Sequence, residues 1–185
     1  MNMTVWLVLA IILLAAIFIP RVGLIAIYKT YRAAMEREQV EDALKHLLDR
    51  EQHGRQASPE SLAGSLNLQR GQVIRLIEDM ETQGLLESRG VNLYLTTQGE
   101  RWAMHVVRAH RLWERYLTDE ARMPLEKVHG ESERHEHLLT EAQLNDLDAA
   151  LGHPTRDPHG DPIPTREGTL LKEEGMPLTA WQTEG

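Results

Sequence analysis

The feature that most constrains this 185-residue chain is an apolar run close to its N-terminus. Residues 4–20 include no charged side chain, and Trp6 and Tyr28 stand near the two ends of the apolar region. About 20 apolar residues are enough for a helix to cross a bilayer, and aromatic side chains favour the membrane interfaces. The sequence therefore predicts a transmembrane anchor over residues 1–30.

The alternative interpretation of this run is a cleaved signal peptide. The run has no positively charged residues before it and no small-residue cleavage site before Pro20, so a retained anchor is favoured. The basic residues that follow it are Arg21, Lys29, Arg32 and Arg37. Because Lys and Arg are enriched on the cytoplasmic side of membrane helices, we expect a single-pass membrane protein whose C-terminal domain is cytoplasmic.

Composition limits what the rest of the chain can be. The 28 acidic side chains outnumber the 20 basic ones and give a net charge of −8, which does not indicate wholesale nucleic-acid binding. A local basic face remains compatible with this balance. Cysteine is absent, so disulfides and thiolate metal sites are excluded and any metal must be held by oxygen and nitrogen donors.

Residues 31–100 have the pattern of a winged helix-turn-helix domain. Apolar residues recur at helical spacing from Tyr31 to Glu51, and Ser58 followed by Pro59 is typical of the start of a second, short helix. A third helix is predicted from Gln72 to Gln83, followed by a β-hairpin that turns at Arg89-Gly90. Thr97-Gln98-Gly99-Glu100 is typical of a capping box that begins the next long helix.

Residues 101–164 are predicted to form a helical domain with clustered metal-binding side chains. His110 and Glu114 are spaced i, i+4 on one helix, and Glu133, Glu136 and His137 are spaced i, i+3, i+4 on another. Side chains at these spacings share one helix face, so they can converge on an ion. The alternative is a solvated polar face, but two such groups together with His129 favour metal binding. The His-Glu-x-x-His motif of zinc proteases is absent.

The last part of the chain contains little regular structure. Residues 152–164 contain four prolines and predict an extended loop, and residues 165–185 are expected to be a flexible tail.

In order along the chain, these features resemble the diphtheria-toxin-repressor and manganese-transport-regulator family. The motifs that support the resemblance are Ala109-His110-Arg111-Leu112-Trp113-Glu114-Arg115, Lys127-Val128-His129, Glu133 with Glu136-His137, and the loop Asp157-Pro158-His159-Gly160-Asp161-Pro162-Ile163-Pro164. The resemblance covers about residues 40–164. It implies a mainly α fold and a dimeric, metal-activated transcriptional repressor.

The resemblance also implies two metal sites. The primary site would comprise Asp42, Glu133, Glu136 and His137, and the ancillary site would comprise His110, Glu114 and His129. Iron-sensing relatives have Met and Cys at the Asp42 and Glu133 positions, whereas manganese sensors have carboxylates there. The cofactor implied is therefore Mn²⁺ or Fe²⁺, in the manganese pattern.

Two departures affect these sites. Manganese sensors have a Glu three residues after Asp42, where this chain has Lys45. Three-domain relatives complete the ancillary site from a C-terminal SH3-like domain, which we do not expect in this chain.

The resemblance places DNA contact on the second helix of the helix-turn-helix. Gln69, Arg70, Gln72 and Arg75 are the residues expected to contact DNA, because Gln and Arg can bind adenine and guanine edges or phosphate. The acidic residues Glu78 and Asp79 that follow should face away from DNA or weaken its binding. Some winged helices serve only as protein-interaction modules, which is the alternative for this domain.

The leading hypothesis is a membrane-tethered, Mn²⁺- or Fe²⁺-dependent transcriptional regulator that binds a DNA operator as a homodimer. The alternative is a regulatory subunit of a metal-uptake transporter that senses metal without binding DNA. Residues 18–24 resemble the end of the last helix of manganese/zinc ABC-transporter permeases, which makes such a transporter a candidate partner. A metal-dependent hydrolase is the third hypothesis, and it is disfavoured because the sequence offers no nucleophile or general base apart from the ligands. We therefore expect no enzymatic activity.

Overall fold

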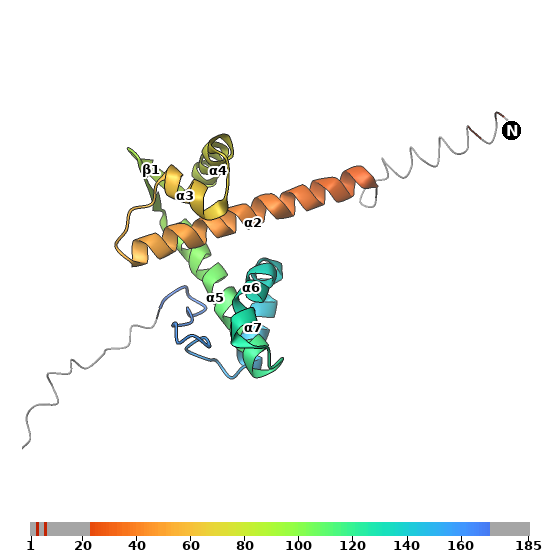
Figure 1. Ribbon diagram of the computed structural model, residues 1–185, viewed down its shortest axis with the longest axis vertical. Helices are drawn as coiled ribbons and strands as arrows, with labels where there is room; N and C mark the ends of the chain where they lie inside the picture. The colour runs from red at the N-terminus through yellow and green to blue at the C-terminus, as the bar shows by residue number, and fades with distance from the viewer. Residues whose placement is uncertain (1–2, 4–5, 7–22, 171–185) are drawn as a thin grey trace, which may run out of the picture.

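The computed structural model describes residues 23–170 together with Met3 and Trp6, and it is mainly helical (Figure 1). The mainly α fold predicted from the sequence is confirmed. Apart from these two residues and the start of the first described helix, the predicted anchor over residues 1–30 lies outside the described part of the chain. Among the helices that are described, none is both long enough and apolar enough to cross a bilayer.

Helix α2 (Leu24–Gln52) is a single 29-residue helix that begins seven residues before the predicted start at Tyr31. Its N-terminal half extends away from the rest of the molecule (Figure 1). Its C-terminal half is buried, and Ala43, Leu44 and Leu47 have no exposed surface. The same helix therefore emerges from the N-terminal region and supplies the central core residues of the first domain.

The predicted helix-turn-helix is present as α3 (Pro59–Leu66) and α4 (Arg70–Thr82). The predicted cap of α3 is confirmed, because the Ser58 hydroxyl accepts a hydrogen bond from the Ser61 amide at 3.2 Å. Helix α4 begins two residues earlier than predicted, since the side-chain oxygen of Gln72 accepts a bond from the Gln69 amide at 2.9 Å.

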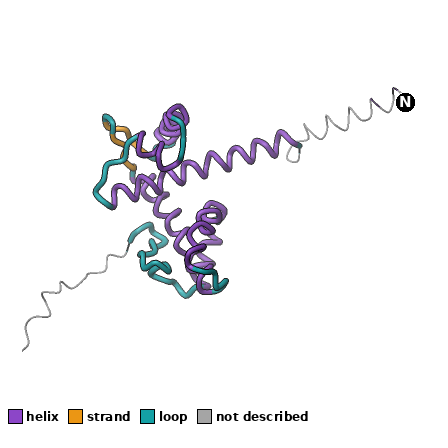
Figure 2. The backbone as a smooth tube through the Cα atoms, viewed as in Figure 1, coloured by secondary structure: helices purple, strands orange, loops and turns teal. Residues whose placement is uncertain are grey.

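The predicted wing is an antiparallel hairpin of β1 (Leu86–Arg89) and β2 (Asn92–Leu95), in which Leu86 pairs with Leu95. The hairpin lies on the same side of α2 as α3 and α4 (Figure 2). Its buried side chains join the core formed by α2, α3 and α4. Residues 40–96 thus form one compact unit around the second half of α2.

Helix α5 (Thr97–Asp119) connects this unit to the second domain. The predicted capping box at Thr97 is wrong by one residue: Thr96 is the cap, and its hydroxyl accepts from the Gly99 amide at 3.1 Å and donates to the Gly84 carbonyl at 2.6 Å. Gly99 lies so close to the backbone just before β1 that a Cβ there would be 1.9 Å from the Leu85 carbonyl oxygen. This contact between Gly99 and Leu85 fixes where α5 leaves the first domain.

The second domain packs α6 (Leu125–His135), the 3₁₀ turn η1 (Glu136–Leu138) and α7 (Glu141–Ala150) against the C-terminal half of α5. Its small core comprises Ala109, Leu112, Leu144 and Ile163, with Leu139, Leu147 and Leu151 packed against them. The loop predicted over residues 152–164 has no helix or strand of its own apart from one isolated bridge.

The predicted tail starts with an ordered turn. The Thr165 amide donates to the Thr169 carbonyl at 2.8 Å, and Leu170 packs against the first core. The remainder of the predicted tail, residues 171–185, lies outside the described residues.

Candidate metal and DNA-binding sites

The segment that joins α6 to α7 differs from the continuous helix expected from the sequence. Helix α6 ends at His135, and Glu136 and His137 lie in the 3₁₀ turn η1. Because a 3₁₀ turn has 3.0 residues per turn instead of 3.6, the directions of the side chains change where α6 ends, and the α-helical spacing no longer defines one face across this junction. The side chain of Glu133 is 55% exposed and lies 3.4 Å from His129 Nε2, whereas that of Glu136 is completely buried. The expected convergence of Glu133, Glu136 and His137 on one helix face is therefore not found.

His137 instead faces α2. Its Nδ1 lies 2.6 Å from Glu41 Oε2, and its Nε2 lies 3.5 Å from both Asp42 Oδ1 and Glu136 Oε1. Burial alone would lower the pKa of His137, but its hydrogen bonds to Asp42 and Glu41 raise that pKa to about 10. The ring is thus fixed on one edge by Glu41 and presents the other edge to the carboxylate of Asp42.

Glu41 contacts the candidate site and was not predicted from the sequence. It is 1% exposed and accepts hydrogen bonds from Arg37 Nε at 2.8 Å and Trp102 Nε1 at 3.2 Å in addition to its contact with His137. Carboxylates that hold the second nitrogen of an imidazole commonly orient histidine ligands at metal sites. Its position one residue before Asp42 on a helix gave no indication of this role.

Glu38, Asp42 and His137 each offer a donor atom within 4.8 Å of the others; we call this group the α2 cluster. Glu38 was also missed, although its i, i+4 spacing from Asp42 is a signal that could have identified it. Asp42, His137 and the predicted ligand Glu133 line one cavity of about 580 Å³, so Glu133 lies beside the α2 cluster.

Glu136 is engaged by other groups. Lys45 Nζ donates to Glu136 Oε1 at 2.6 Å, and His110 Nδ1 forms a short contact with Glu136 Oε2. The negative charge of this predicted ligand is therefore already neutralised by a lysine from α2. Lys45 is the residue at which the sequence departs from the manganese-sensor pattern.

The three residues predicted for the ancillary site lie together, and we call them the α5 cluster. His110 Nε2, Glu114 Oε1 and His129 Nδ1 are 3.1 Å apart in each pairwise combination. Burial would lower the pKa of His110, but its hydrogen bonds to Glu114 and Glu136 raise it overall. Burial would likewise raise the pKa of Glu114, but the hydrogen bond to His110 lowers it.

The donor spacing of the α5 cluster fits a metal ion. Two donors at right angles around a cation, each about 2.1 Å from it, lie about 3 Å apart. The three mutual contacts of 3.1 Å between His110, Glu114 and His129 are also the separations expected of donors that converge on one cation. The α2 cluster offers two carboxylates and one imidazole, which is also a suitable donor set for a divalent first-row metal.

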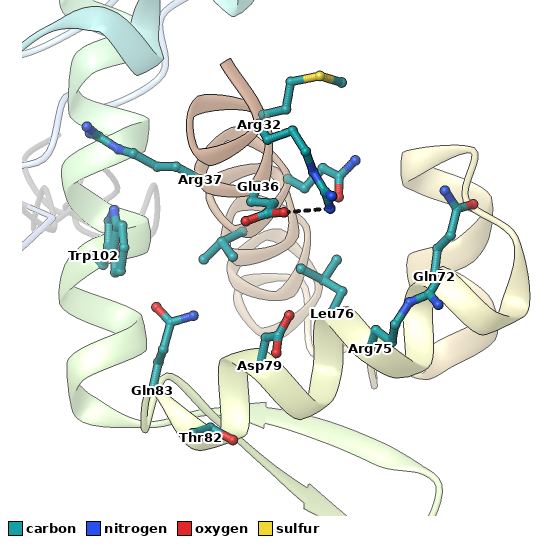
Figure 3. A pocket seen from close by; sticks show the side chains of 13 residues that line it. Arg32, Glu36, Arg37, Gln72, Arg75, Leu76, Asp79, Thr82, Gln83 and Trp102 are labelled. Carbon is teal, nitrogen blue, oxygen red and sulfur yellow. Dashed lines mark hydrogen bonds and ion pairs between the residues drawn. The ribbon is translucent and has the colours of Figure 1, made fainter. Parts of the chain in front are cut away.

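The four predicted DNA-contacting residues, Gln69, Arg70, Gln72 and Arg75, are all exposed at or near the start of α4. Gln72 and Arg75 line a cavity of about 1040 Å³ between α4 and the N-terminal half of α2, where Arg32 and Glu36 form an ion pair (Figure 3). Asp79 lines the same cavity as Arg75, so one of the two acidic residues that we expect to face away from DNA or to weaken its binding lies beside the predicted DNA-contacting residues.

Comparison with known proteins shows which families this chain is similar to. Residues 96–165 match the family model described as the iron dependent repressor, metal binding and dimerisation domain. The iron-dependent repressor IdeR of Mycobacterium leprae is 38% identical over 122 residues, which cover 65% of this chain and 53% of that protein. The chain thus spans about half the length of the repressors that it matches.

Two further matches bear on metal and membrane association. A solved manganese-dependent transcriptional repressor in complex with manganese superposes with a TM-score of 0.68 at 33% identity, covering 73% of this chain and 63% of that one. A probable metal transport system membrane protein of Chlamydia trachomatis is 38% identical over 84 residues, which cover 45% of this chain and 19% of that protein. The repressors among these proteins are not enzymes, in agreement with the expectation for this chain.

Proposed function

We propose that the chain is a metal-dependent transcriptional regulator of the iron-dependent repressor type, which binds DNA as a homodimer when Mn²⁺ or Fe²⁺ is bound; the match of residues 96–165 to the family model supports this. The relatives named as iron-dependent and manganese-dependent repressors support both the function and the choice of metals.

One observation carries the proposal: the α2 cluster joins the two domains. Glu38 and Asp42 belong to α2, which forms the core of the winged helix-turn-helix, whereas His137 belongs to η1 in the second domain. In the absence of a cation, the two neighbouring carboxylates repel each other. A divalent cation bound there would supply the compensating charge, and Glu38, Asp42 and His137 would then hold the two domains in one relative orientation. Such couplings are typically worth about 1 to 3 kcal/mol.

The set of donor atoms in the α2 cluster limits which metal ions can activate DNA binding. Two carboxylates and one imidazole suit Mn²⁺ and Fe²⁺, although Zn²⁺ and Cu²⁺ bind similar donors at least as tightly. Selectivity is therefore expected in the DNA affinity that each metal induces rather than in metal affinity alone. The neighbouring pair of Lys45 and Glu136 keeps a further carboxylate away from the ion.

DNA contact is assigned to the start of α4. The N-terminal residues of the second helix of a helix-turn-helix enter the major groove, and Arg70 and Arg75 are exposed there. The side-chain oxygen of Gln72 is bound to the Gln69 amide, so Gln72 would contact DNA through its side-chain NH₂ group. A bidentate contact between arginine and guanine is worth about 1 to 3 kcal/mol of discrimination.

Membrane tethering is part of the proposal. It is supported by the uncharged run of residues 4–20 and by the basic residues that follow. Helix α2 begins at Leu24 and continues without a break into the DNA-binding domain, so such an anchor would be connected to that domain by a helix.

The test uses the full-length chain purified in detergent. A preferred DNA sequence is selected from a random duplex pool in the presence of MnCl₂, and DNA affinity is then measured by fluorescence anisotropy with and without MnCl₂ while metal binding is followed by calorimetry. We expect MnCl₂ to increase DNA affinity at least fivefold, and Asp42→Ala to abolish this increase. Asp146→Ala removes an exposed carboxylate on α7 and serves as the matched control. Wild-type metal dependence in Asp42→Ala would show that the α2 cluster does not link the domains.

The second candidate function is a regulatory domain of a metal transporter. It is favoured by the match to the membrane protein of a probable metal transport system in Chlamydia trachomatis. Metal binding at wild-type stoichiometry, with no DNA sequence selected from the random pool, would support this candidate over the first.

A further inference from the structure

The first half of α2 carries an apolar stripe that is exposed in the described structure. The stripe comprises Leu24, Ile27, Tyr28, Tyr31 and Met35, which are between 42% and 62% exposed. Because an α-helix turns by about 100° per residue, these five positions fall within an arc of about 100° on one side of the helix. This half of α2 extends away from both domains, so neither domain covers the stripe (Figure 1).

The stripe lies on the opposite side of α2 from the core of the first domain. In the second half of the helix, Ala43, Leu44 and Leu47 have no exposed surface. Helical geometry places these core residues about half a turn around the axis from Leu24 and Tyr31. The apolar face of α2 therefore changes sides along the helix. Packing within the first domain explains the face of the second half, whereas the face of the first half has no such partner among the described residues.

The charges on the first half of α2 are all basic. Residues 24–35 include Lys29 and Arg32, which are both exposed, and no acidic side chain. The first acidic residue of the chain is Glu36, whose exposed ion pair with Arg32 marks the end of this basic segment (Figure 3). All 28 acidic side chains therefore lie after the segment, in a chain whose net charge is −8. An apolar helix face with basic residues around it is typical of helices that lie on an anionic bilayer.

Two tyrosines give the stripe a further property of membrane-surface helices. Tyr28 and Tyr31 are 60% and 62% exposed. The apolar body of a tyrosine ring can enter the headgroup region while its hydroxyl stays hydrated, which is why tyrosine is enriched at membrane interfaces.

The start of α2 allows the helix to follow a surface. Gly23, the N-cap residue, has an extended backbone with φ −72° and ψ 159°. Helix α2 therefore begins anew at Leu24, and its axis is not fixed by a continuous helix from the preceding uncharged run of residues 4–20.

We propose that residues 24–35 of α2 lie on the surface of a bilayer that contains anionic lipids, with the apolar stripe in the headgroup region. The inference rests on the proposed membrane tethering, and it adds a second contact between the chain and the membrane. Lys29 and Arg32 lie close enough to the lipid phosphates to be attracted, since the surface potential extends over a Debye length of about 8 Å. The contact is about 18 Å long and ends where the acidic residues begin.

A second copy of the chain fits the stripe less well. Residues 24–35 span fewer than two heptads, whereas coiled coils are indicated by apolar positions sustained over about three to four heptads. They also contain no acidic side chain that could pair with Lys29 or Arg32 across a pair of identical helices. The charge of this segment is complementary to an anionic lipid surface and not to itself.

The test places a spin label on each side of α2 in the full-length chain. The chain contains no cysteine, so one introduced cysteine is labelled specifically. Tyr31→Cys labels the stripe, and Ala33→Cys is the matched control on the opposite side of the same helical turn. Each chain is reconstituted in nanodiscs of phosphatidylcholine and phosphatidylglycerol, and electron paramagnetic resonance measures how accessible the label is to O₂ and to a neutral, water-soluble nickel chelate. We expect the ratio of O₂ to nickel accessibility to be about threefold or more higher at Tyr31→Cys than at Ala33→Cys, because O₂ concentrates among the acyl chains.

The charge requirement is tested in the Tyr31→Cys background. Lys29→Gln together with Arg32→Gln should lower the ratio of membrane-bound to free helix about tenfold or more. Lys127→Gln together with Arg134→Gln removes two exposed basic residues from α6 and should leave that ratio unchanged. Nanodiscs of phosphatidylcholine alone should have the same effect on the wild-type charges as the loss of Lys29 and Arg32.

The possible failures are distinguishable. Equal accessibility ratios at Tyr31→Cys and Ala33→Cys, in chains that are incorporated into the discs and keep MnCl₂-dependent DNA affinity, would overturn the inference and leave the proposed function intact. Chains recovered free of the discs would contradict the membrane tethering and the inference together. Spin–spin broadening between two Tyr31→Cys labels, equal in discs and in detergent, would overturn the inference by assigning the stripe to a second copy.

Discussion

Lys45 occupies a position where its removal should have opposite effects on the metal-free and metal-bound protein. The side chain of Lys45 is 23% exposed and its ammonium lies 2.6 Å from the fully buried carboxylate of Glu136. Breaking a buried ion pair by removing one partner costs about 3 to 5 kcal/mol. Because Lys45 is partly exposed and Glu136 retains its contact with His110, we expect Lys45→Met to lower metal-free stability by about 2 to 3 kcal/mol.

The same substitution should strengthen metal binding. The ammonium of Lys45 competes with any cation for Glu136, whose Oε1 lies only 3.5 Å from His137 Nε2 of the α2 cluster. Without Lys45, Glu136 can add a carboxylate to Glu38, Asp42 and His137. We expect Mn²⁺ affinity to increase about tenfold, which corresponds to about 1.4 kcal/mol.

Thermal unfolding and calorimetry on the full-length chain measure both effects. For a chain of this size, 2 to 3 kcal/mol corresponds to a fall in Tm of about 4 to 12 °C without metal. Excess MnCl₂ should raise the Tm of Lys45→Met by more than it raises that of the wild type, because the stabilisation grows with the ratio of ligand concentration to Kd. Lys127→Met, which removes an exposed lysine from α6, is the control. Unchanged or weaker Mn²⁺ binding in Lys45→Met would refute the argument that Lys45 competes with the metal.

Three further predictions follow from the proposed function. Arg75→Ala should weaken specific DNA binding by about 1 to 3 kcal/mol in anisotropy measurements, whereas Arg134→Ala on α6 should not; equal affinities would exclude this face of α4. The pKa of His137 is raised to about 10, so its contribution to metal-free stability is fully present below its unfolded pKa of about 6.5 and is lost as pH rises through about 10. Mn²⁺ must then displace a proton from His137, so the Mn²⁺ affinity should increase from pH 7 to pH 9. The heat of Mn²⁺ binding measured by calorimetry should also vary with the ionisation enthalpy of the buffer. Neither change would be seen if the ring of His137 were neutral. Membrane fractionation should recover the full chain in the pellet after a high-salt wash and a variant lacking residues 1–22 in the supernatant, and a salt-extractable full chain would contradict the anchor.

The first domain could be predicted from the sequence because its signals are local. The cap at Ser58, the turn at Gly90 and the apolar spacing of α2 and α4 each depend on residues within one or two helical turns. In this domain, the predicted helices and strands differ from the observed ones only at their ends, such as the cap at Thr96 instead of Thr97.

The α2 cluster could not be predicted in full because its geometry depends on distant contacts. No proline or glycine marks the end of α6 at His135, and the side chains that hold η1 against α2 are separated from their partners by 91 residues for Lys45 and Glu136 and by 96 residues for Glu41 and His137. Glu38 resembles any other exposed acid on a helix until His137 is placed beside it. In contrast, His110 and Glu114 share one α-helix, so their helical spacing sufficed to place them together.

The structure also links the α2 and α5 clusters through a single imidazole. His110 presents Nε2 to Glu114 and His129 within the α5 cluster, whereas its Nδ1 contacts Glu136, which lies beside His137 of the α2 cluster. The pKa of His110 is raised in the metal-free chain, which favours a proton on both nitrogens. To bind a metal ion, Nε2 of His110 must lose its proton. The proton that remains on Nδ1 can then donate a hydrogen bond to Glu136 and hold it beside His137. Metal binding at the α5 cluster would therefore change the charge next to the α2 cluster, and by thermodynamic reciprocity metal binding at the α2 cluster would change the metal affinity of the α5 cluster by the same factor.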